Sequence, residues 1–335
     1  RVAILDLHDG YRSRQDPAGD PVQAFRDKLG INFLSYGMAY YPWVHTTALS
    51  ERSLSFENFS PDSLPMLVDL LENDLGIAGA EPASLSRRQL AQKAEVDKLV
   101  GDWGADSPIS PSDLATLKTQ LNQALIATSA AYGRLLGHMA AVVNLLPPSA
   151  LMAGVFTTVD NTRGVWKAPA NVSLAGVVSP SVNISHDEQE DLNVTPQGKS
   201  INAIRAFTGE GVLVWGARTL DGNSLDWRYI NVRRTMIMLE ESIRLANKAY
   251  VFEPNVANTW VTIKSMISNF LNGIWKRGGL AGATPEDAFA VFVGLGETMT
   301  PEDILEGILR VTVLVAISRP AEFIEITFQQ QMQKS

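Results

Sequence analysis

The end of the chain constrains its fold more than any other segment. Ile324, Ile326 and Phe328 alternate with polar residues, and a polar tail follows. Such alternation is typical of a β-strand with one apolar face. Arg319-Pro320 separates it from another strand predicted over Leu309 to Ile317, and the proline marks an edge or a bend. A terminal strand of this kind either closes the chain's own sheet, which composition favours, or pairs with the open edge of a neighbouring sheet.

The start of the chain has the pattern of a strand, a helix and a second strand. Residues 1–7 are largely apolar, and a turn-rich connector precedes a short helix predicted over Val22 to Leu29. Strand character returns over Asn32 to His45, where aromatic residues are frequent. A crossover of this length joins parallel neighbours, so we expect a βαβ unit. Because the chain starts directly with a strand and without Met, we expect it to begin inside a domain.

The stretch from Ser60 to Leu146 is predicted to be mainly helical. Ser60-Pro61 and Ser110-Pro111 each place a capping hydroxyl before a proline suited to the first helical turn. Between residues 112 and 146, apolar residues recur at alternating steps of three and four, which predicts one long amphipathic helix that ends at Pro147-Pro148. Its apolar stripe packs on the core or, as the alternative, forms a coiled coil.

Short strands and strong helices follow from Ser149 onward. Strands are predicted over Ile201 to Phe207 and Gly211 to Arg218, and helices over residues 228–250 and after Pro254-Asn255. Thr284-Pro285 and Thr300-Pro301 both start helices, each with a Thr cap and acids in the first turn. The expected fold class is α/β (α+β), a mixed β-sheet flanked by helices with a helical insertion and an extended C-terminal strand or arm. The expected segments are 1–59 (core strands), 60–146 (mainly helical), 147–318 (C-terminal domain) and 319–335 (arm).

Composition excludes several classes of protein and of site. With 45% hydrophobic and 19% charged residues, the chain can bury a substantial core. It has no cysteine, which removes disulfides, thiolate metal ligands and a cysteine nucleophile. The formal net charge is −8 with acids and bases interspersed, so nucleic acid is not an expected partner. Apolar stretches such as Val311 to Ile317 fall short of the roughly 20 residues that a membrane-spanning helix needs, so no membrane insertion is expected.

The motifs that would carry enzyme or metal chemistry fail their spacing tests. Gly198-Lys199-Ser200 is similar to the end of a phosphate-binding loop, but such a loop needs glycine where Asn193 stands. His186 and Glu190 stand one helical turn apart without a further ligand cluster, and a solvated acidic turn is the simpler interpretation. No Gly-x-Ser-x-Gly elbow is present. We therefore expect no catalytic residue, no metal and no cofactor.

An ordered series of motifs covers the chain from Leu146 onward. It includes Leu146-Pro147-Pro148-Ser149-Ala150, Arg163-Gly164-Val165-Trp166-Lys167, Val214-Trp215-Gly216-Ala217-Arg218, Trp227-Arg228-Tyr229-Ile230-Asn231, Phe252-Glu253-Pro254-Asn255 and Arg319-Pro320-Ala321-Glu322-Phe323. This series resembles the C-terminal half of contractile tail sheath proteins, the family shared by phage tails, pyocin-like particles and contractile injection systems. Residues 2–6 and 39–44 also look like core strands of that family. The long helical stretch and the loop over residues 293–303 are more similar to sheaths of Bacteroidetes-type extracellular injection particles than to those of myophage tails.

The resemblance implies a structural subunit, not an enzyme. Such subunits polymerise as stacked hexameric rings around an inner tube and contract to drive that tube through a target envelope. The implied partners are further copies of the chain, the inner tube protein, baseplate and tail-terminator or cap proteins, and paralogous sheath proteins. The subunit would assemble in the cytoplasm and enter a phage tail-like particle that is released extracellularly or anchored at the cell envelope.

The resemblance also implies three sets of site residues. An exchanged inter-subunit arm would comprise Arg319, Pro320, Phe323, Ile324, Ile326 and Phe328. Four arginines are either ordinary surface or core-edge cations or members of inter-subunit charge pairs: Arg218, Arg228, Arg233 and Arg234. Tube attachment is expected at Thr284, Pro285, Glu286, Asp287 and Phe289 or, failing that, at Thr300 to Leu309. Two other functions stay open, a soluble α/β hydrolase or transferase with an unrecognised site and a monomeric adaptor.

Overall fold

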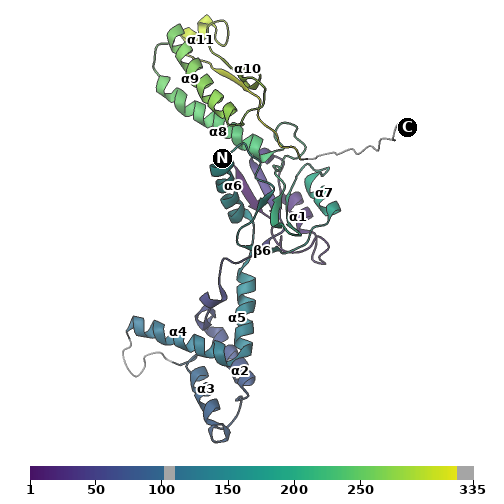
Figure 1. Cartoon of the computed structure of the whole chain (residues 1–335), viewed down its shortest axis with the longest axis vertical. Coiled ribbons are helices and arrows are strands. Elements are labelled where there is room, and N and C mark those ends of the chain that lie inside the picture. Colours follow the sequence, from purple (N-terminus) through teal and green to yellow (C-terminus); the bar gives the residue numbers. More distant parts are fainter. Residues whose placement is uncertain (102–109, 323–335) are drawn as a thin grey trace, which may run out of the picture. The chain divides into compact units, whose positions relative to one another are not determined.

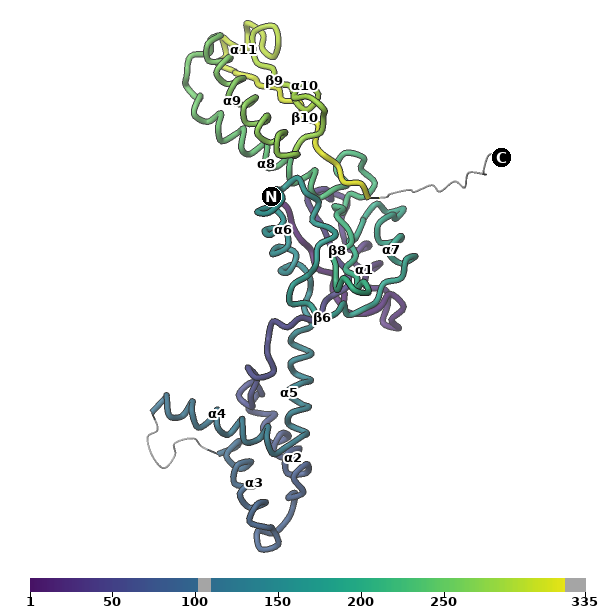
Figure 2. The backbone as a smooth tube through the Cα atoms, viewed as in Figure 1, coloured from purple at the N-terminus to yellow at the C-terminus, as the bar shows by residue number. Residues whose placement is uncertain are grey.

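The computed structural model describes residues 1–101 and 110–322, and its contacts divide the chain into two compact units. The core unit comprises residues 1–43, 147–175 and 179–335, and the helical unit comprises residues 44–146 and 176–178. The chain leaves the core unit after Trp43 and returns to it at Pro147. Figure 2 shows the course of the backbone, coloured along the sequence. Residues 60–146, expected as a helical segment, lie in the helical unit.

The core unit contains both strands and helices in its described part. Its strands are β1 (Ala3–Asp6), β2 (Gly37–Tyr41), β5 (Val172–Ser173), β7 (Asn202–Phe207), β8 (Gly211–Trp215), β9 (Phe289–Phe292) and β10 (Thr312–Val315). Its helices are α1 (Pro21–Lys28), α6 (Ser149–Arg163), α7 (His186–Asn193), α8 (Ile230–Asn247), α9 (Ala257–Lys276), α10 (Pro285–Ala288) and α11 (Pro301–Leu305). This mixture of sheet and flanking helices confirms the predicted α+β class.

A five-stranded mixed sheet in the order β1-β2-β7-β8-β5 forms the centre of the core unit (Figure 1). β1 and β2 are parallel, with Ala3 opposite Gly37, and α1 is their crossover, so the predicted βαβ unit is confirmed. β7 runs parallel to β2 and forms an antiparallel hairpin with β8. The strand predicted over residues 32–45 is split, because Pro42 has no N–H to donate and the chain continues in a different sheet.

Different helices cover the two faces of this sheet. Leu5 and Leu7 point to one face, where they belong to a core that includes residues of α1 and α7. Asp6 alternates with them and points to the opposite face. There its carboxylate accepts hydrogen bonds from the backbone N–H (2.9 Å) and the hydroxyl of Ser149, at the start of α6. Figure 1 shows α6 on one side of the sheet and α1 and α7 on the other.

A second core lies between α8, α9 and the β9–β10 ribbon. The buried stripe of α9 includes Ile263, Ile267, Leu271 and Ile274, at helical spacing. β9 and β10 are antiparallel and form a two-stranded sheet among the described residues. Alternate residues of the ribbon face α9, whereas Leu314 is 57% exposed. The strand predicted over residues 309–317 is confirmed in a shorter form as β10.

The helical unit contains α2 (Leu64–Leu75), α3 (Arg87–Asp97), α4 (Pro111–Thr128) and α5 (Ala130–Val143). β3 (Val44–Thr46) and β4 (Leu145–Leu146) pair at the point where the chain enters and leaves this unit, in a sheet ordered β4-β3-β6 with β6 at Val177–Pro180. In the described ranges, no helix combines the length and the apolar character that crossing a membrane requires.

The prediction of one long helix over residues 112–146 is wrong, because the helix breaks at Ser129. This residue is extended (φ −116°, ψ 115°), and its hydroxyl accepts a hydrogen bond from the N–H of Tyr132 at 3.1 Å. The same hydroxyl donates to the carboxylate of Asp74 at 2.6 Å. The apolar stripe continues across the break because Leu125 of α4 and Leu136 of α5 enter the same core. The spacing of apolar residues alone therefore could not reveal the break at Ser129.

Candidate assembly interface

The arm root, residues 318–322, lies against the segment between β8 and α8. The side-chain amide of Asn231 donates to the carbonyl of Ser318 at 3.0 Å. Arg319 donates through Nη1 to the carbonyl of Leu225 at 3.0 Å. The first residues of the predicted arm are thus attached to the core unit of their own chain.

Glu322 makes the closest contacts of the arm root. Its two carboxylate oxygens accept hydrogen bonds from Nε (2.9 Å) and Nη2 (2.7 Å) of Arg218, and one of them also accepts from the hydroxyl of Tyr229 (3.1 Å). Arg218 is 3% exposed and donates through Nη1 to the carbonyl of Asn193 at 2.9 Å. Burial and the negative charge of Glu322 raise the pKa of Tyr229, which keeps its hydroxyl a donor. A forked pair of this kind, here named the Arg218–Glu322 clamp, combines strength with a defined direction.

The clamp is connected to the central sheet through Asn202. This β7 residue is fully buried, and its side-chain oxygen accepts from the N–H of Arg218 at 2.7 Å. Its side-chain amide donates to the carbonyls of Arg218 (2.8 Å) and Ala39 (3.1 Å). Asn202 therefore joins the backbone of Arg218 to β2 and β7, which lie in the middle of the sheet.

The other predicted arginines also have partners within their own chain. Arg233 is 7% exposed and lies over the ring of Trp227, 3.5 Å from its centroid. Arg234 donates through Nη1 to the carboxylate of Asp160 at 2.9 Å. Arg228 donates to a backbone carbonyl of its own loop at 3.1 Å. These contacts are those of core-edge cations, and a role in inter-subunit charge pairs stays a prediction.

The residues predicted for tube attachment come together in the single turn of α10. Thr284 caps the turn and donates through its hydroxyl to Asp287 at 2.9 Å, with Pro285 in the first position. Glu286 and Asp287 are exposed, whereas Phe289 begins β9 and packs against the core of α9. The turn thus presents its acids outward, and their binding to a tube stays a prediction.

Most of the predicted arm lies outside the described residues. Arg319 and Pro320 belong to the arm root, whereas Phe323, Ile324, Ile326 and Phe328 follow the last described residue. The sequence reasoning did not select Glu322 as a site residue. The sequence does place this acid in the motif that begins at Arg319, shortly after a predicted strand. Its partner Arg218, however, lies 104 residues away in the sequence.

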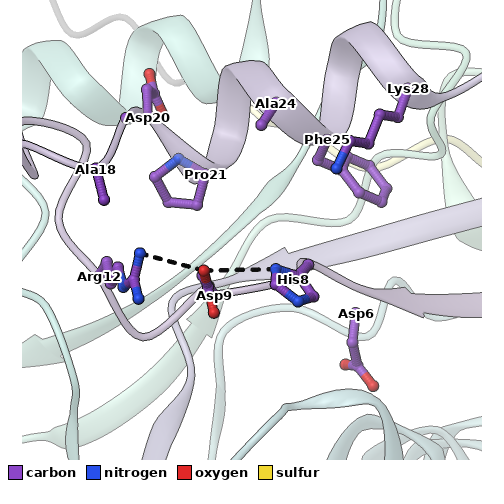
Figure 3. A pocket seen from close by; sticks show the side chains of 11 residues that line it. Asp6, His8, Asp9, Arg12, Ala18, Asp20, Pro21, Ala24, Phe25 and Lys28 are labelled. Carbon is purple, nitrogen blue, oxygen red and sulfur yellow. Dashed lines mark ion pairs between the residues drawn. The ribbon is translucent and has the colours of Figure 1, made fainter.

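A pocket at the end of β1 has charged side chains in its wall (Figure 3). It has a volume of about 300 Å³ and is lined by acids, bases, Phe25 and small residues, all within the first 28 residues. Its acids have structural partners: Asp9 pairs with Arg12 at 3.2 Å, and Asp20 caps α1 by accepting from the N–H of Val22 at 2.8 Å. The side chain of His8 is 90% exposed, and its Nδ1 lies 3.5 Å from the same carboxylate of Asp9. Within ranges 1–101 and 110–322, no group of three or more His, Asp or Glu side chains is placed to hold a metal ion.

Two family models match this chain. The phage tail sheath protein central domain matches residues 105–220, and the phage tail sheath C-terminal domain matches residues 223–331. The tail sheath protein of Enterobacteria phage T4 is 25% identical over 138 residues, 40% of this chain and 20% of that protein. The tail sheath protein of Burkholderia phage BcepMu is 30% identical over 115 residues, 33% of this chain and 24% of that protein.

Solved sheath structures are similar to this chain, and their sequence identity to it is higher than that of the two phage proteins. The anti-feeding prophage (AFP) helical sheath in its contracted state is 47% identical with a TM-score of 0.52, covering 56% of this chain and 51% of that chain. The sheath complex of the extracellular contractile injection system PVC, also contracted, is 46% identical with a TM-score of 0.53 and the same coverage. The chain thus matches about half the length of these sheath proteins and a quarter or less of the two phage proteins. With its motifs, its fold and both family models in agreement, this chain belongs to the contractile tail sheath family.

Proposed function

We propose that this chain is a structural subunit of a contractile sheath. In this proposal, copies polymerise as stacked hexameric rings around an inner tube, and the lattice contracts to drive the tube through a target envelope. Family membership supports it, together with similarity to subunits solved in a contracted helical sheath and in a six-fold symmetrised baseplate. Contraction would be a downhill transition from a metastable extended lattice to a compact one, with no nucleotide hydrolysed in the subunit.

The Arg218–Glu322 clamp carries the proposal. A strand that pairs with a neighbouring copy transmits force between subunits, so the residues before it need firm attachment to their own body. Glu322 supplies this attachment through charge-assisted hydrogen bonds to a buried guanidinium. Main-chain pairing beyond the clamp can persist while the subunits reorient, because it depends little on how the two bodies face each other.

The β9–β10 ribbon is the acceptor that we assign to the arm of a neighbouring copy. Two-stranded sheets are marginal in water and gain stability from a third strand. One face of this ribbon packs on α9, and no third strand pairs with it in the described part of the chain. The alternating residues Ile324, Ile326 and Phe328 would supply that strand.

The proposal includes partners and a place of assembly. The inner tube would contact the exposed acids Glu286 and Asp287 of α10 or, as the second candidate, residues 300–309. Baseplate, terminator or cap proteins and paralogous sheath proteins would bind the ends of the lattice. The subunit would have no catalytic role, and the particle would assemble in the cytoplasm before release or anchoring at the cell envelope. Residues 1–59 and 147–318 would form the sheath body, 60–146 an added helical segment and 319–335 the arm.

Two truncations of the chain test the proposal. Deleting residues 323–335 removes the apolar strand but leaves the clamp, whereas deleting residues 320–335 removes both. We expect the whole chain to form rods with a cogwheel cross-section in negative stain, and neither truncated chain to do so. Circular dichroism should show that the shorter deletion leaves the body folded. Well-formed rods from the 323–335 deletion would contradict arm exchange, and a whole chain that stays monomeric at high concentration would contradict the sheath function and favour an adaptor.

A further inference from the structure

A cavity beside the arm root is lined by four cations and by no acid. It has a volume of about 320 Å³ and lies where α6 and α9 end. The cations are Arg163, Lys167, Arg277 and Arg319, and the ring of Trp166 forms part of the wall. Such a concentration of positive charge is unexpected in a chain whose formal net charge is −8.

Contacts within the chain do not balance this charge. Arg163 and Arg277 stand at helix C-termini, each of which offers only about −0.5 charge. Arg319 lies 3.5 Å from the carboxylate of Asp226, which is 78% exposed. Arg163 and Lys167 have no side-chain hydrogen bond or ion pair to any residue in the described ranges. An excess of about two positive charges therefore remains at the cavity.

Complementary charge is available on α7. Asp187 and Glu190 are exposed and form no ion pair with the described residues. Standing three positions apart, they lie on one face of the helix. The other acids of α7 are engaged, because Glu188 accepts from Gln15 at 2.9 Å and Asp191 pairs with two arginines.

Within the described chain, neither Asp187 nor Glu190 forms a side-chain hydrogen bond or ion pair with a residue that lines the cavity. α7 covers the face of the central sheet to which Leu7 points, whereas α6 covers the face to which Asp6 points (Figure 1). Two complementary patches of one body that do not contact each other can pair between copies, in a head-to-tail contact. Such contacts generate rings when the rotation closes and helical arrays when it does not.

We propose that the cation-lined cavity receives the carboxylates of Asp187 and Glu190 from a second copy of this chain. The proposal rests on the sheath function proposed above and adds a contact between subunit bodies that is separate from arm exchange. Because the carboxylates would enter a partly enclosed site with two or more cations, the contact contributes to assembly and weakens as salt is added.

A reciprocal charge reversal in the whole chain tests this contact. One variant carries Arg163→Glu and Lys167→Glu, a second carries Asp187→Lys and Glu190→Lys, and a third combines all four changes. The control variant carries Arg87→Glu and Arg88→Glu, two exposed cations of α3 that have no ion pair among the described residues. It changes the net charge by the same amount as the first variant. Sedimentation at low and high salt, with negative stain, measures the assembled fraction, and thermal melting checks that each variant is folded.

We expect either single reversal to lower the assembled fraction at low salt by about tenfold or more, since a like-charge contact costs several kcal/mol. The combined variant should recover to within about threefold of the unchanged chain, and the control should assemble normally. A combined variant that assembles no better than the single reversals overturns the pairing of α7 with the cavity. Normal assembly of both single reversals overturns it too and leaves the sheath function intact, whereas failure of the unchanged chain to assemble counts against the sheath function itself.

Discussion

Arg218 and Glu322 stand 104 residues apart in sequence, yet Nη2 of the guanidinium lies 2.7 Å from Oε2 of the carboxylate. The side chain of Arg218 is 4% exposed and that of Glu322 is 18% exposed. A buried guanidinium keeps its charge, so its carboxylate partner offsets a large desolvation cost. The pair therefore contributes to the stability of the C-terminal end of the described chain as well as to the direction in which the arm root points.

Substituting Glu322→Gln is expected to lower the free energy of unfolding by about 3 kcal/mol, because it leaves the buried cation of Arg218 without its counter-charge. Urea denaturation measures this loss, and hydrogen exchange should show faster exchange over residues 312–322. The control is Arg310→Gln, which removes an exposed ion pair to Asp303 and should cost much less, because water screens exposed ion pairs. Equal losses in the two variants would contradict the role given to the clamp.

Asn202→Ala is expected to destabilise the core unit by about 2 kcal/mol or more, since it removes the side-chain hydrogen bonds to three buried backbone groups. Thermal and urea unfolding measure the change. The matched variant is Asn73→Ala, whose side chain makes one exposed hydrogen bond to the carbonyl of Asp69. That variant should stay within about 0.5 kcal/mol of the unchanged chain. If both asparagines proved equally dispensable, Asn202 would not support Arg218.

Ser129→Ala is expected to cost about 1–2 kcal/mol in the helical unit, because it removes the cap of α5 together with the hydrogen bond to Asp74. Ser110→Ala, which removes the exposed cap of α4, should cost less. Circular dichroism melts of both variants measure the difference. A larger loss from Ser110→Ala would mean that the break between α4 and α5 does not depend on Ser129.

The stability of the chain is expected to depend on pH through Asp191. Burial would raise the pKa of this carboxyl, but the hydrogen bonds and charges of Arg26 and Arg14 outweigh it and hold the pKa below its usual value. A carboxyl whose pKa is lowered by folding stabilises the folded state above its unfolded pKa of about 3.9. This contribution is lost as the pH falls through the folded pKa.

Asp191→Asn should therefore be less stable than the unchanged chain at pH 7, and the difference should shrink below about pH 4. Urea denaturation of both proteins at pH 7, 5, 4 and 3 provides the comparison. Glu210→Gln, which removes an exposed carboxyl without an ion pair in the described chain, is the control. A stability gap for Asp191→Asn that stays constant down to pH 3 would show that the charge of Asp191 is not what stabilises the fold.

Leu314→Lys is expected to reduce assembly without reducing stability, because Leu314 is 57% exposed on the outer face of the ribbon proposed to accept the arm. Sedimentation and negative stain measure assembly, and thermal melting measures stability. Leu245→Lys on α8, at a position 55% exposed, is the matched control and should assemble normally. Rods of normal length from Leu314→Lys would argue against the β9–β10 ribbon as the acceptor.

Elements with local signals could be predicted from the sequence. The starts of α10 and α11 follow from Thr284 and Thr300, because each cap, its proline and the acid that completes the capping box lie within four residues. The βαβ unit follows from alternation and crossover length. The break at Ser129 could not be predicted, because α4 and α5 continue the same apolar stripe and only one residue marks the change of direction.

Only part of the candidate interface could be predicted from the sequence. The motif around Arg319 indicates where an arm begins, but the contact of Glu322 with Arg218 forms only when β8 and the arm root are brought together by the fold. Arg163 and Lys167 stand in one of the quoted motifs, but the cavity that they share with Arg277 forms only in the fold, where α6 and α9 end. Conversely, Arg233 and Arg234 looked available for a partner, and the fold gives them Trp227 and Asp160.

The place where Asn202 holds Arg218 has a mechanical consequence. A pull on the proposed arm would enter the body at Glu322 and pass to the guanidinium of Arg218. Through the backbone of Arg218 it would reach the side chain of Asn202, which bonds to two inner strands. The force is thus delivered to the interior of a five-stranded sheet, where many backbone bonds resist shear together, and not to a surface loop that peels away bond by bond. In the arm exchange proposed above, a load on the arm would therefore be shared among the strands of the sheet.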